Sequence, residues 1–303
     1  MDFSIANKTV QWVGPGLRTG RVWHAPAEPP VRRPGATQRL KFISAVFIFL
    51  TMTLPLSAAQ QGFGMTQSEW HGYERLDFVV AGQPAILIVP KTAAPGKPWV
   101  WRAEWFGDRH APQVSLALLE QGWHLAYINA SDRYGSPAAM EIFDAFHGRL
   151  TKDFGLASKM VLEGFSRGGL YAFNFAATWP DRVAVLYLDA PALDLRSWPG
   201  YKTVRWPEVA AAYGLTVEEL ETAKVSPLDR IEPVVKAGIP IIGVSGDADV
   251  VVKMDENLTV LAERYRAAGG TIEVIVKPGA GHSPHSLPDP KPIVDFILKH
   301  AKY

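Results

Sequence analysis

Apolar and polar residues alternate with two different periods along residues 73–300 of this 303-residue chain. Short apolar runs that are bounded by glycine, proline or polar residues are typical of strands buried in a sheet. The predicted strands cover residues 73–80, 84–89, 98–104, 124–129, 159–162, 183–188, 240–245 and 271–276. An Ala-Gly-Gln turn separates the first two strands, which predicts a hairpin at the start of the sheet.

Apolar residues spaced three and four apart predict helices between these strands. Residues 114–120 form one such segment, which stops at Gly122. Ser136 is the predicted N-cap of another helix, with Pro137 at its first position. Further helices are predicted after residue 245 and at the C-terminal end. A hairpin followed by repeated strand–helix units predicts an α/β fold, with a mostly parallel sheet and helices on both faces.

The first 59 residues do not follow this pattern. Residues 1–38 contain five Pro and four Gly without apolar periodicity, which predicts a disordered preamble or a misplaced translation start. Residues 39–59 combine two basic residues, an uncharged apolar run and a final Ser-Ala-Ala, which is typical of a secretory signal peptide. The run is shorter than the roughly 20 residues that span a membrane. We therefore expect a periplasmic or secreted protein with a single domain at residues 60–303.

Residues 191–235 interrupt the alternation of strands and helices. They lie between two predicted strands but are too long for a simple connection. They contain Trp198, Trp206 and a helical segment at residues 217–223. We expect a small helical cap over the site, in which Trp198 contacts substrate. The alternative is a peripheral insertion without a role in the chemistry.

Composition excludes several classes of function. The chain has 31 Lys and Arg against 30 Asp and Glu, so its net charge of +1 argues against a nucleic-acid partner. It contains no Cys, which excludes disulfides, zinc–thiolate sites and a thiol nucleophile. We predict no metal, no cofactor and no membrane insertion after signal cleavage. The oligomeric state is left open.

The segment Gly164-Phe165-Ser166-Arg167-Gly168 carries the strongest chemical signal. It follows a predicted buried strand and precedes an apolar helical segment, which is the setting of a G-x-S-x-G nucleophile elbow. A serine at such a turn has strained backbone angles and crowded neighbours, which explains the flanking glycines. We therefore predict that Ser166 is a nucleophile. The alternative is a glycine-rich turn capped by a serine.

A serine needs a base, and the base needs an orienting carboxylate. Three histidines follow the elbow, namely His282, His285 and His300. His282 ends a Gly-Ala-Gly-His loop after the last predicted strand, at its carboxyl end, where open α/β sheets bind their ligands. We predict His282 as the base. His285 is the rival, and His300 is expected at the surface of the last helix.

Three aspartates are candidates for the carboxylate. Asp247 and Asp249 follow the predicted strand at 240–245, and Asp189 ends the preceding strand. Asp249 is the preferred candidate because a helix and a strand fit between it and His282. Asp247 is expected to cap the turn, and Asp189 is the remaining alternative.

The oxyanion hole of such a site needs two backbone N–H donors. One is expected from Arg167, which follows the nucleophile, and the other from the loop after the third strand. That loop reads Arg-Ala-Glu-Trp-Phe-Gly, and Trp105 is the preferred donor, with Glu104 as the alternative. Glu104 is also a predicted substrate contact. Because Glu104 and Arg167 should lie beside the same serine, we predict an ion pair between them. The alternative is that Arg167 contacts a substrate carboxylate or solvent.

Together these segments resemble the α/β-hydrolase superfamily. The elbow, the Gly-Asp-Ala-Asp segment and the Gly-His segment occur in that family's order. Gly-Phe-Ser-Arg-Gly-Gly and the Trp-Arg-Ala-Glu-Trp loop look most similar to secreted bacterial hydrolases of polysaccharide-degrading systems. The resemblance implies a serine esterase with a Ser166–His282–Asp249 triad, and the narrower resemblance implies a carbohydrate-linked ester.

Two other functions are considered. A peptidase on the same scaffold usually carries a large extra domain, for which residues 60–303 leave no room. A non-catalytic binding protein normally lacks a triad member, whereas all three are present here. We therefore expect a serine hydrolase that cleaves carboxylic esters of small molecules or carbohydrates through an acyl-enzyme.

Overall fold

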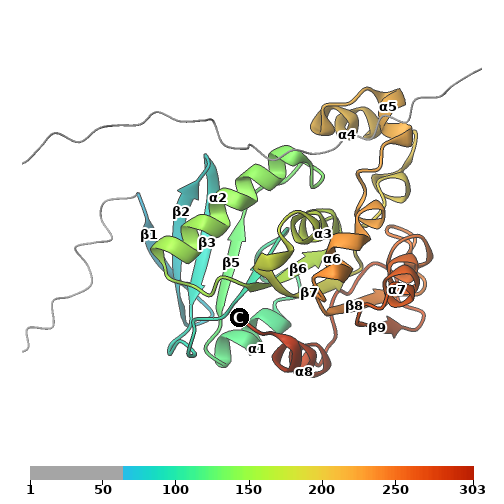
Figure 1. Cartoon of the computed structure of the whole chain (residues 1–303). Coiled ribbons are helices and arrows are strands. Elements are labelled where there is room, and N and C mark those ends of the chain that lie inside the picture. The colour runs from blue at the N-terminus through green and yellow to red at the C-terminus, as the bar shows by residue number, and fades with distance from the viewer. Residues whose placement is uncertain (1–63) are drawn as a thin grey trace, which may run out of the picture. The chain divides into compact units, whose positions relative to one another are not determined.

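The computed structural model describes residues 64–303 as a nine-stranded sheet flanked by helices (Figure 1). The predictions for residues 1–38 and 39–59 lie outside the described residues. The strands are Thr66–Trp70 (β1), Tyr73–Val80 (β2), Gln83–Val89 (β3), Trp99–Arg102 (β4), His124–Ile128 (β5), Met160–Phe165 (β6), Val183–Asp189 (β7), Ile241–Gly246 (β8) and Ile272–Lys277 (β9). The α-helices are Gln113–Glu120 (α1), Pro137–Asp153 (α2), Gly168–Thr178 (α3), Trp206–Tyr213 (α4), Val217–Thr222 (α5), Ile231–Lys236 (α6), Leu258–Ala267 (α7) and Lys291–His300 (α8).

The strand order is β1-β2-β3-β5-β4-β6-β7-β8-β9. The first three strands and β5 pair antiparallel, whereas β5, β4 and β6 to β9 run parallel to one another. This arrangement confirms the predicted α/β fold with an initial hairpin. Strand β1 was not predicted, because its Thr-Gln-Ser-Glu-Trp sequence is polar and largely exposed. Among the described strands it lies at the edge and pairs with β2 alone, so backbone hydrogen bonds rather than side-chain burial define it.

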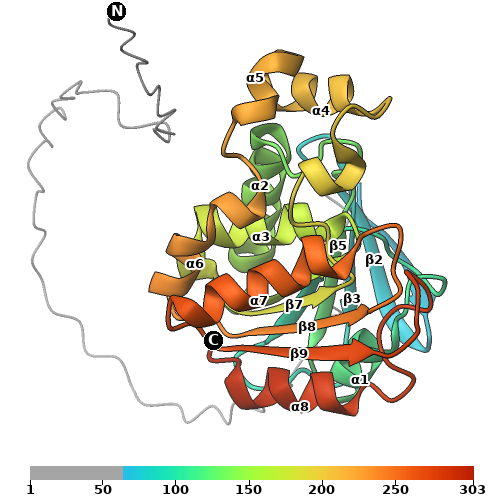
Figure 2. The same ribbon diagram turned by 90° about the vertical axis from the view of Figure 1, so that its right-hand side faces the viewer.

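The helices cover the two faces of the sheet with separate hydrophobic clusters. Apolar residues of α1 and α8 belong to one cluster, and those of α2, α3 and α7 belong to the other. Figure 2 shows α8 on one side of β8 and β9, with α7 on the opposite side. Central strands β4, β6 and β7 are buried along their whole length, as expected for parallel strands covered on both faces.

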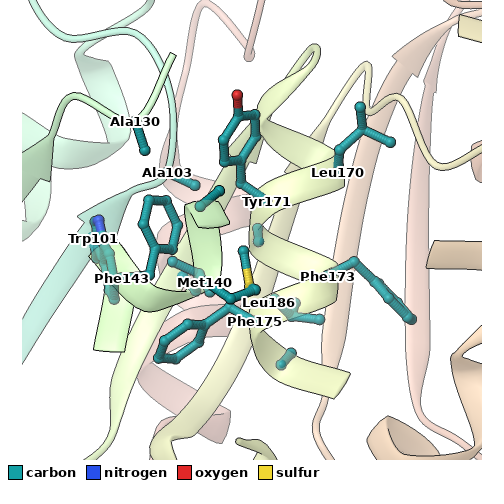
Figure 3. Close-up of a cluster of buried hydrophobic side chains, with 14 of the residues drawn as sticks. Trp101, Ala103, Ala130, Met140, Phe143, Leu170, Tyr171, Phe173, Phe175 and Leu186 are labelled. Atoms are coloured by element: carbon teal, nitrogen blue, oxygen red, sulfur yellow. The ribbon is translucent and has the colours of Figure 1, made fainter. Parts of the chain in front are cut away.

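Aromatic side chains hold β4 against helices α2 and α3 (Figure 3). The ring of Trp101 lies 4.5 Å from that of Phe143 and 5.2 Å from that of Phe175. Such contacts add to the free energy gained from burying apolar area. The carboxyl ends of β4 and β6, which carry the candidate site, therefore rest on a tightly packed core.

Helix α2 begins as predicted, with Pro137 at its first position. Ser136 occupies the N-cap position, but its side chain makes no capping hydrogen bond and its hydroxyl is buried without a partner. Ser136 is thus the N-cap residue as predicted, although it caps the helix without a side-chain hydrogen bond among the described residues.

The stretch at 191–235 contains helices α4, α5 and α6. Figures 1 and 2 show α4 and α5 standing beyond the layer of helices that covers the sheet. The segment is attached through Tyr213, whose hydroxyl donates to the backbone oxygen of Tyr134 at 2.9 Å, and through Glu208, which accepts from the Tyr134 hydroxyl at 2.8 Å. Within residues 64–303, no helix is both long and apolar enough to cross a membrane.

Candidate active site

Ser166 lies in the sharp turn between β6 and α3. Its φ of 51° is in the left-handed region, which costs a non-glycine residue free energy and is typical of functional turns. Two backbone hydrogen bonds hold this conformation. The Ser166 N–H donates to the backbone oxygen of Asp189 at 2.8 Å, and the backbone oxygen of Ser166 accepts from the Ala192 N–H at 2.9 Å. The turn is thus fixed by the neighbouring strand and by the loop that follows it.

Glycines surround the turn because neighbouring atoms leave no space for side chains. A Cβ at position 164 would lie 2.9 Å from the Ala172 Cβ, and one at position 168 would lie 3.0 Å from the Glu104 Cβ. The space at position 169 is smaller still, since a Cβ there would lie 2.6 Å from the backbone oxygen of Ala192. The sequence argument attributed this steric role to Gly164 and Gly168 and missed Gly169.

The structure brings His282 to Ser166 and Asp249. The Ser166 Oγ lies 2.9 Å from the Nε2 of His282, and the His282 Nδ1 lies 2.7 Å from the Oδ2 of Asp249. The second oxygen of Asp249 accepts from the N–H groups of Val251 and Val252 at 2.8 and 2.9 Å. These bonds orient the carboxylate so that it can hold the His282 ring with Nε2 toward the serine.

The four other candidates have different partners. The Oδ1 of Asp247 accepts from the Gly279 N–H at 2.6 Å, so this side chain contacts the loop after β9, and its predicted role as a cap of its own turn stays a prediction. Asp189 faces His285, with 3.6 Å between Oδ1 and Nδ1. His300 lies on α8, with its ring 4.4 Å from that of Phe296. The structure therefore separates two His–Asp pairs, of which only His282–Asp249 contacts the serine hydroxyl.

Arg167 directly follows Ser166, and Trp105, the other predicted oxyanion donor, packs against the Arg167 side chain. Trp105 has a φ of 62°, and its ring lies 4.4 Å from the guanidinium carbon of Arg167 and 5.4 Å from the ring of His110. Within residues 64–303, the backbone N–H groups of Trp105 and Arg167 donate no hydrogen bond to another residue. Their roles as oxyanion donors stay predictions.

The predicted Arg167–Glu104 ion pair is confirmed, with 3.1 Å between the guanidinium and Oε1. Oε1 also accepts from the Ser131 hydroxyl at 2.5 Å, and the Glu104 side chain is only 1% exposed. Burial raises the pKa of Glu104, and the nearby Arg167 charge opposes that rise. The Glu104 side chain is almost fully buried and is paired with Arg167. Its role as a direct substrate contact stays a prediction.

Asp132 is a second carboxylate on Arg167 that the sequence argument missed. Its Oδ1 accepts from the guanidinium at 2.9 Å, while its side chain is 81% exposed. Asp132 follows β5, at the same edge of the sheet as the other site residues. Open α/β sheets bind their ligands at the carboxyl ends of the strands, and this rule could have indicated Asp132 from the sequence.

Trp198 lies in the 191–235 segment, with its ring 6.4 Å from that of Tyr134. Its predicted contact with substrate stays a prediction. Residues 64–303 contain no group of three or more His, Cys, Asp or Glu side chains arranged to hold a metal ion.

The sequence itself identifies the family of this protein. The model of the Peptidase_S9, prolyl oligopeptidase family matches residues 122–302, which is more than half of the chain. The protein belongs to the prolyl oligopeptidase family. It is a serine hydrolase, and the match includes Ser166, Asp249 and His282 but not the loop that carries Trp105. No curated protein matches the sequence.

Solved structures with the same fold include peptidases and esterases. Dipeptidyl peptidase 4 from Porphyromonas gingivalis superposes with a TM-score of 0.58 at 15% identity, covering 75% of this chain and 35% of that one. This chain thus spans about a third of that peptidase. A cold-adapted esterase from an Arctic intertidal metagenomic library superposes with a TM-score of 0.53 at 16% identity, covering 79% and 99% of the two chains. Est1E from Butyrivibrio proteoclasticus gives 0.54 at 18% identity, covering 78% and 98%.

Proposed function

We propose that this serine hydrolase cleaves carboxylic esters by a Ser166–His282–Asp249 triad. The observation that carries the proposal is the continuous chain of short contacts from the serine hydroxyl through both ring nitrogens of His282 to a buried carboxylate. A serine at a left-handed strand-to-helix turn is exposed to substrate and cannot relax without breaking its backbone hydrogen bonds.

Each step of the reaction uses a group in this geometry. Ser166 Oγ attacks the ester carbonyl while His282 Nε2 takes its proton, and Asp249 stabilises the resulting imidazolium. The N–H groups of Trp105 and Arg167 bind the oxyanion that develops on the carbonyl oxygen. His282 then protonates the leaving alcohol, which leaves an acyl-enzyme on Ser166. Water, deprotonated by His282, attacks this intermediate and releases the acid.

Ester rather than peptide cleavage is supported by the structural neighbours of comparable length. The metagenomic esterase aligns with this chain along 99% of its length, whereas only 35% of the dipeptidyl peptidase aligns. Peptide hydrolysis is the second candidate, because the family itself is named for a peptidase. We further propose that the protein is exported and that its natural esters are attached to carbohydrate, in keeping with the signal-peptide pattern and the resemblance of its motifs.

A substrate panel on the full chain and on the Ser166→Ala variant tests this proposal. The panel contains p-nitrophenyl acyl esters, acetylated and methyl-esterified sugars, and dipeptidyl p-nitroanilides. We expect ester turnover that falls about 10⁴–10⁶-fold in Ser166→Ala, together with covalent labelling of Ser166 by a fluorophosphonate in the unmodified protein. Retention of ester turnover in the variant refutes the triad, and faster cleavage of the anilides than of the esters refutes the esterase assignment.

A further inference from the structure

The loop that carries His282 also carries His285, a largely buried histidine with 12% of its side chain exposed, which the proposed reaction does not use. The two rings meet edge to face, with centroids 4.7 Å apart and an interplanar angle of 87°. Ser166 and Asp249 contact the two nitrogens of His282 but leave its ring free to tilt about the line that joins them. A ring packed against its side limits this motion.

His285 is itself tightly held. Its ring lies 3.8 Å from the ring of Phe165, the residue just before the nucleophile, at an interplanar angle of 78°. Its Nδ1 is buried and has no hydrogen-bond partner within the described residues, but it faces the Asp189 Oδ1 at 3.6 Å. The Asp189 Oδ1 is likewise buried without a hydrogen-bond partner among residues 64–303.

Asp189 connects the nucleophile turn to the base loop. Its backbone oxygen accepts from the Ser166 N–H at 2.8 Å, and its Oδ2 accepts from the Ser286 N–H at 2.5 Å. The Tyr187 hydroxyl lies 3.4 Å from the same Oδ2 and donates to the Ser286 hydroxyl at 3.1 Å. One residue thus holds the backbone of Ser166 and the segment that follows His282.

Within the described residues, the Asp189 carboxylate has no close lysine or arginine to balance its charge. The Asp189 carboxylate is 1% exposed, and within residues 64–303 no lysine or arginine nitrogen lies within 4 Å of it. The buried cation Arg102 pairs with the equally buried Glu163 at 3.3 Å. The rings of His282 and His110 lie near His285, and burial lowers the pKa of His110. A buried carboxylate without a cation is costly, and His285 can supply the balancing charge.

We propose that His285 and Asp189 form a buried imidazolium–carboxylate pair that positions the His282 ring for proton transfer from and to Ser166. The proposal rests on the triad proposed above. His285 and Asp189 are positioning residues, since neither contacts the hydroxyl of Ser166.

The test compares His285→Gln, Asp189→Asn and the double variant with His300→Gln, a matched change at a histidine on α8. For each variant, kcat and KM for p-nitrophenyl acetate are measured between about pH 5 and 9, with the melting temperature. We expect kcat to fall about 10–100-fold in each single variant while KM stays within about twofold, because a displacement of about 1 Å has an effect of this size. The double variant should lose no more than the worse single variant, and His300→Gln should match the unmodified protein.

The pH profile separates positioning from packing. In His285→Gln the buried Asp189 charge is left unbalanced beside His282, so protonated His282 is favoured and the acid limb of kcat/KM should move to higher pH. In Asp189→Asn the carboxylate charge is removed and His285 loses its proton with it, so the net charge beside His282 does not change. The acid limb of kcat/KM should therefore stay at the same pH. A pure packing role would lower the melting temperature and kcat without this difference between the variants.

Unchanged kcat, or an unchanged acid limb in His285→Gln, overturns the proposal. If His285→Gln does not fold, histidine ¹⁵N spectra of the unmodified protein decide, because His285 should bear protons on both ring nitrogens at a pH where His282 does not. A neutral His285 under those conditions overturns the pair. These failures differ from failure of the triad, which Ser166→Ala reports independently.

Discussion

Breaking the Arg167–Glu104 pair should destabilise the protein and displace the oxyanion loop, by different amounts from its two sides. In Glu104→Gln, Arg167 keeps Asp132 at 2.9 Å and the Trp105 ring. The loss is then that of one charged hydrogen bond, about 1–3 kcal/mol. In Arg167→Met, Glu104 keeps only the Ser131 hydroxyl in a site where it is 1% exposed. A buried charge left this way costs about 3–5 kcal/mol.

The larger loss of stability, in Arg167→Met, should depend on pH. Burial already raises the pKa of Glu104 in the folded state, and removing Arg167 removes the charge that opposes this rise. A carboxyl group whose folded pKa lies above its unfolded value stabilises the fold below the unfolded pKa, near about 4.5, and loses that contribution as pH rises through the folded pKa. Arg167→Met should therefore approach the stability of the unmodified protein near pH 4.5 and fall progressively below it toward pH 8.

Thermal unfolding and steady-state kinetics at several pH values test this reasoning. For a domain of this size, each kcal/mol corresponds to a change of about 2–4 °C in the melting temperature. The double variant should be less destabilised than the sum of the single variants, since the two residues interact directly. In both single variants kcat should fall by up to about 10²-fold, because Trp105 follows Glu104 directly. Additive losses, or a deficit in Arg167→Met that does not change with pH, would refute the account.

Two further changes have clear expectations. Asp249→Asn should lower kcat about 10⁴-fold without loss of folding, whereas Asp247→Asn should change kcat little; equal effects in kcat assays would show that the carboxylate is misassigned. Gly169→Ala should lower stability by at least about 1–3 kcal/mol, because its Cβ would lie 2.6 Å from the backbone oxygen of Ala192. Gly148→Ala is the control, since nothing lies within 4 Å of a Cβ there, and calorimetry should show unchanged or slightly raised stability.

The sequence was sufficient for the fold class and for the position of the nucleophile candidate. Buried parallel strands are short apolar runs and their helices are amphipathic, so both leave a local pattern. The elbow is local too, because the glycines that relieve crowding lie within three residues of Ser166. Strand β1 left no such pattern, because its pairing with β2 involves backbone atoms and its side chains face solvent.

The partners of the serine were determined by tertiary structure. Parallel strands β7, β8 and β9 end at the same edge of the sheet, so Asp189, Asp249 and His282 all come near Ser166. Sequence order favoured Asp249, but only the directions of the side chains show that Asp249 faces His282 while Asp189 faces His285. Asp189 is directed by a hydrogen bond from the distant Ser286 N–H, whereas Asp249 is directed by the nearby N–H groups of Val251 and Val252. Asp249 meets His282 because strands β8 and β9 are neighbours in the sheet, and no local pattern of residues encodes that pairing.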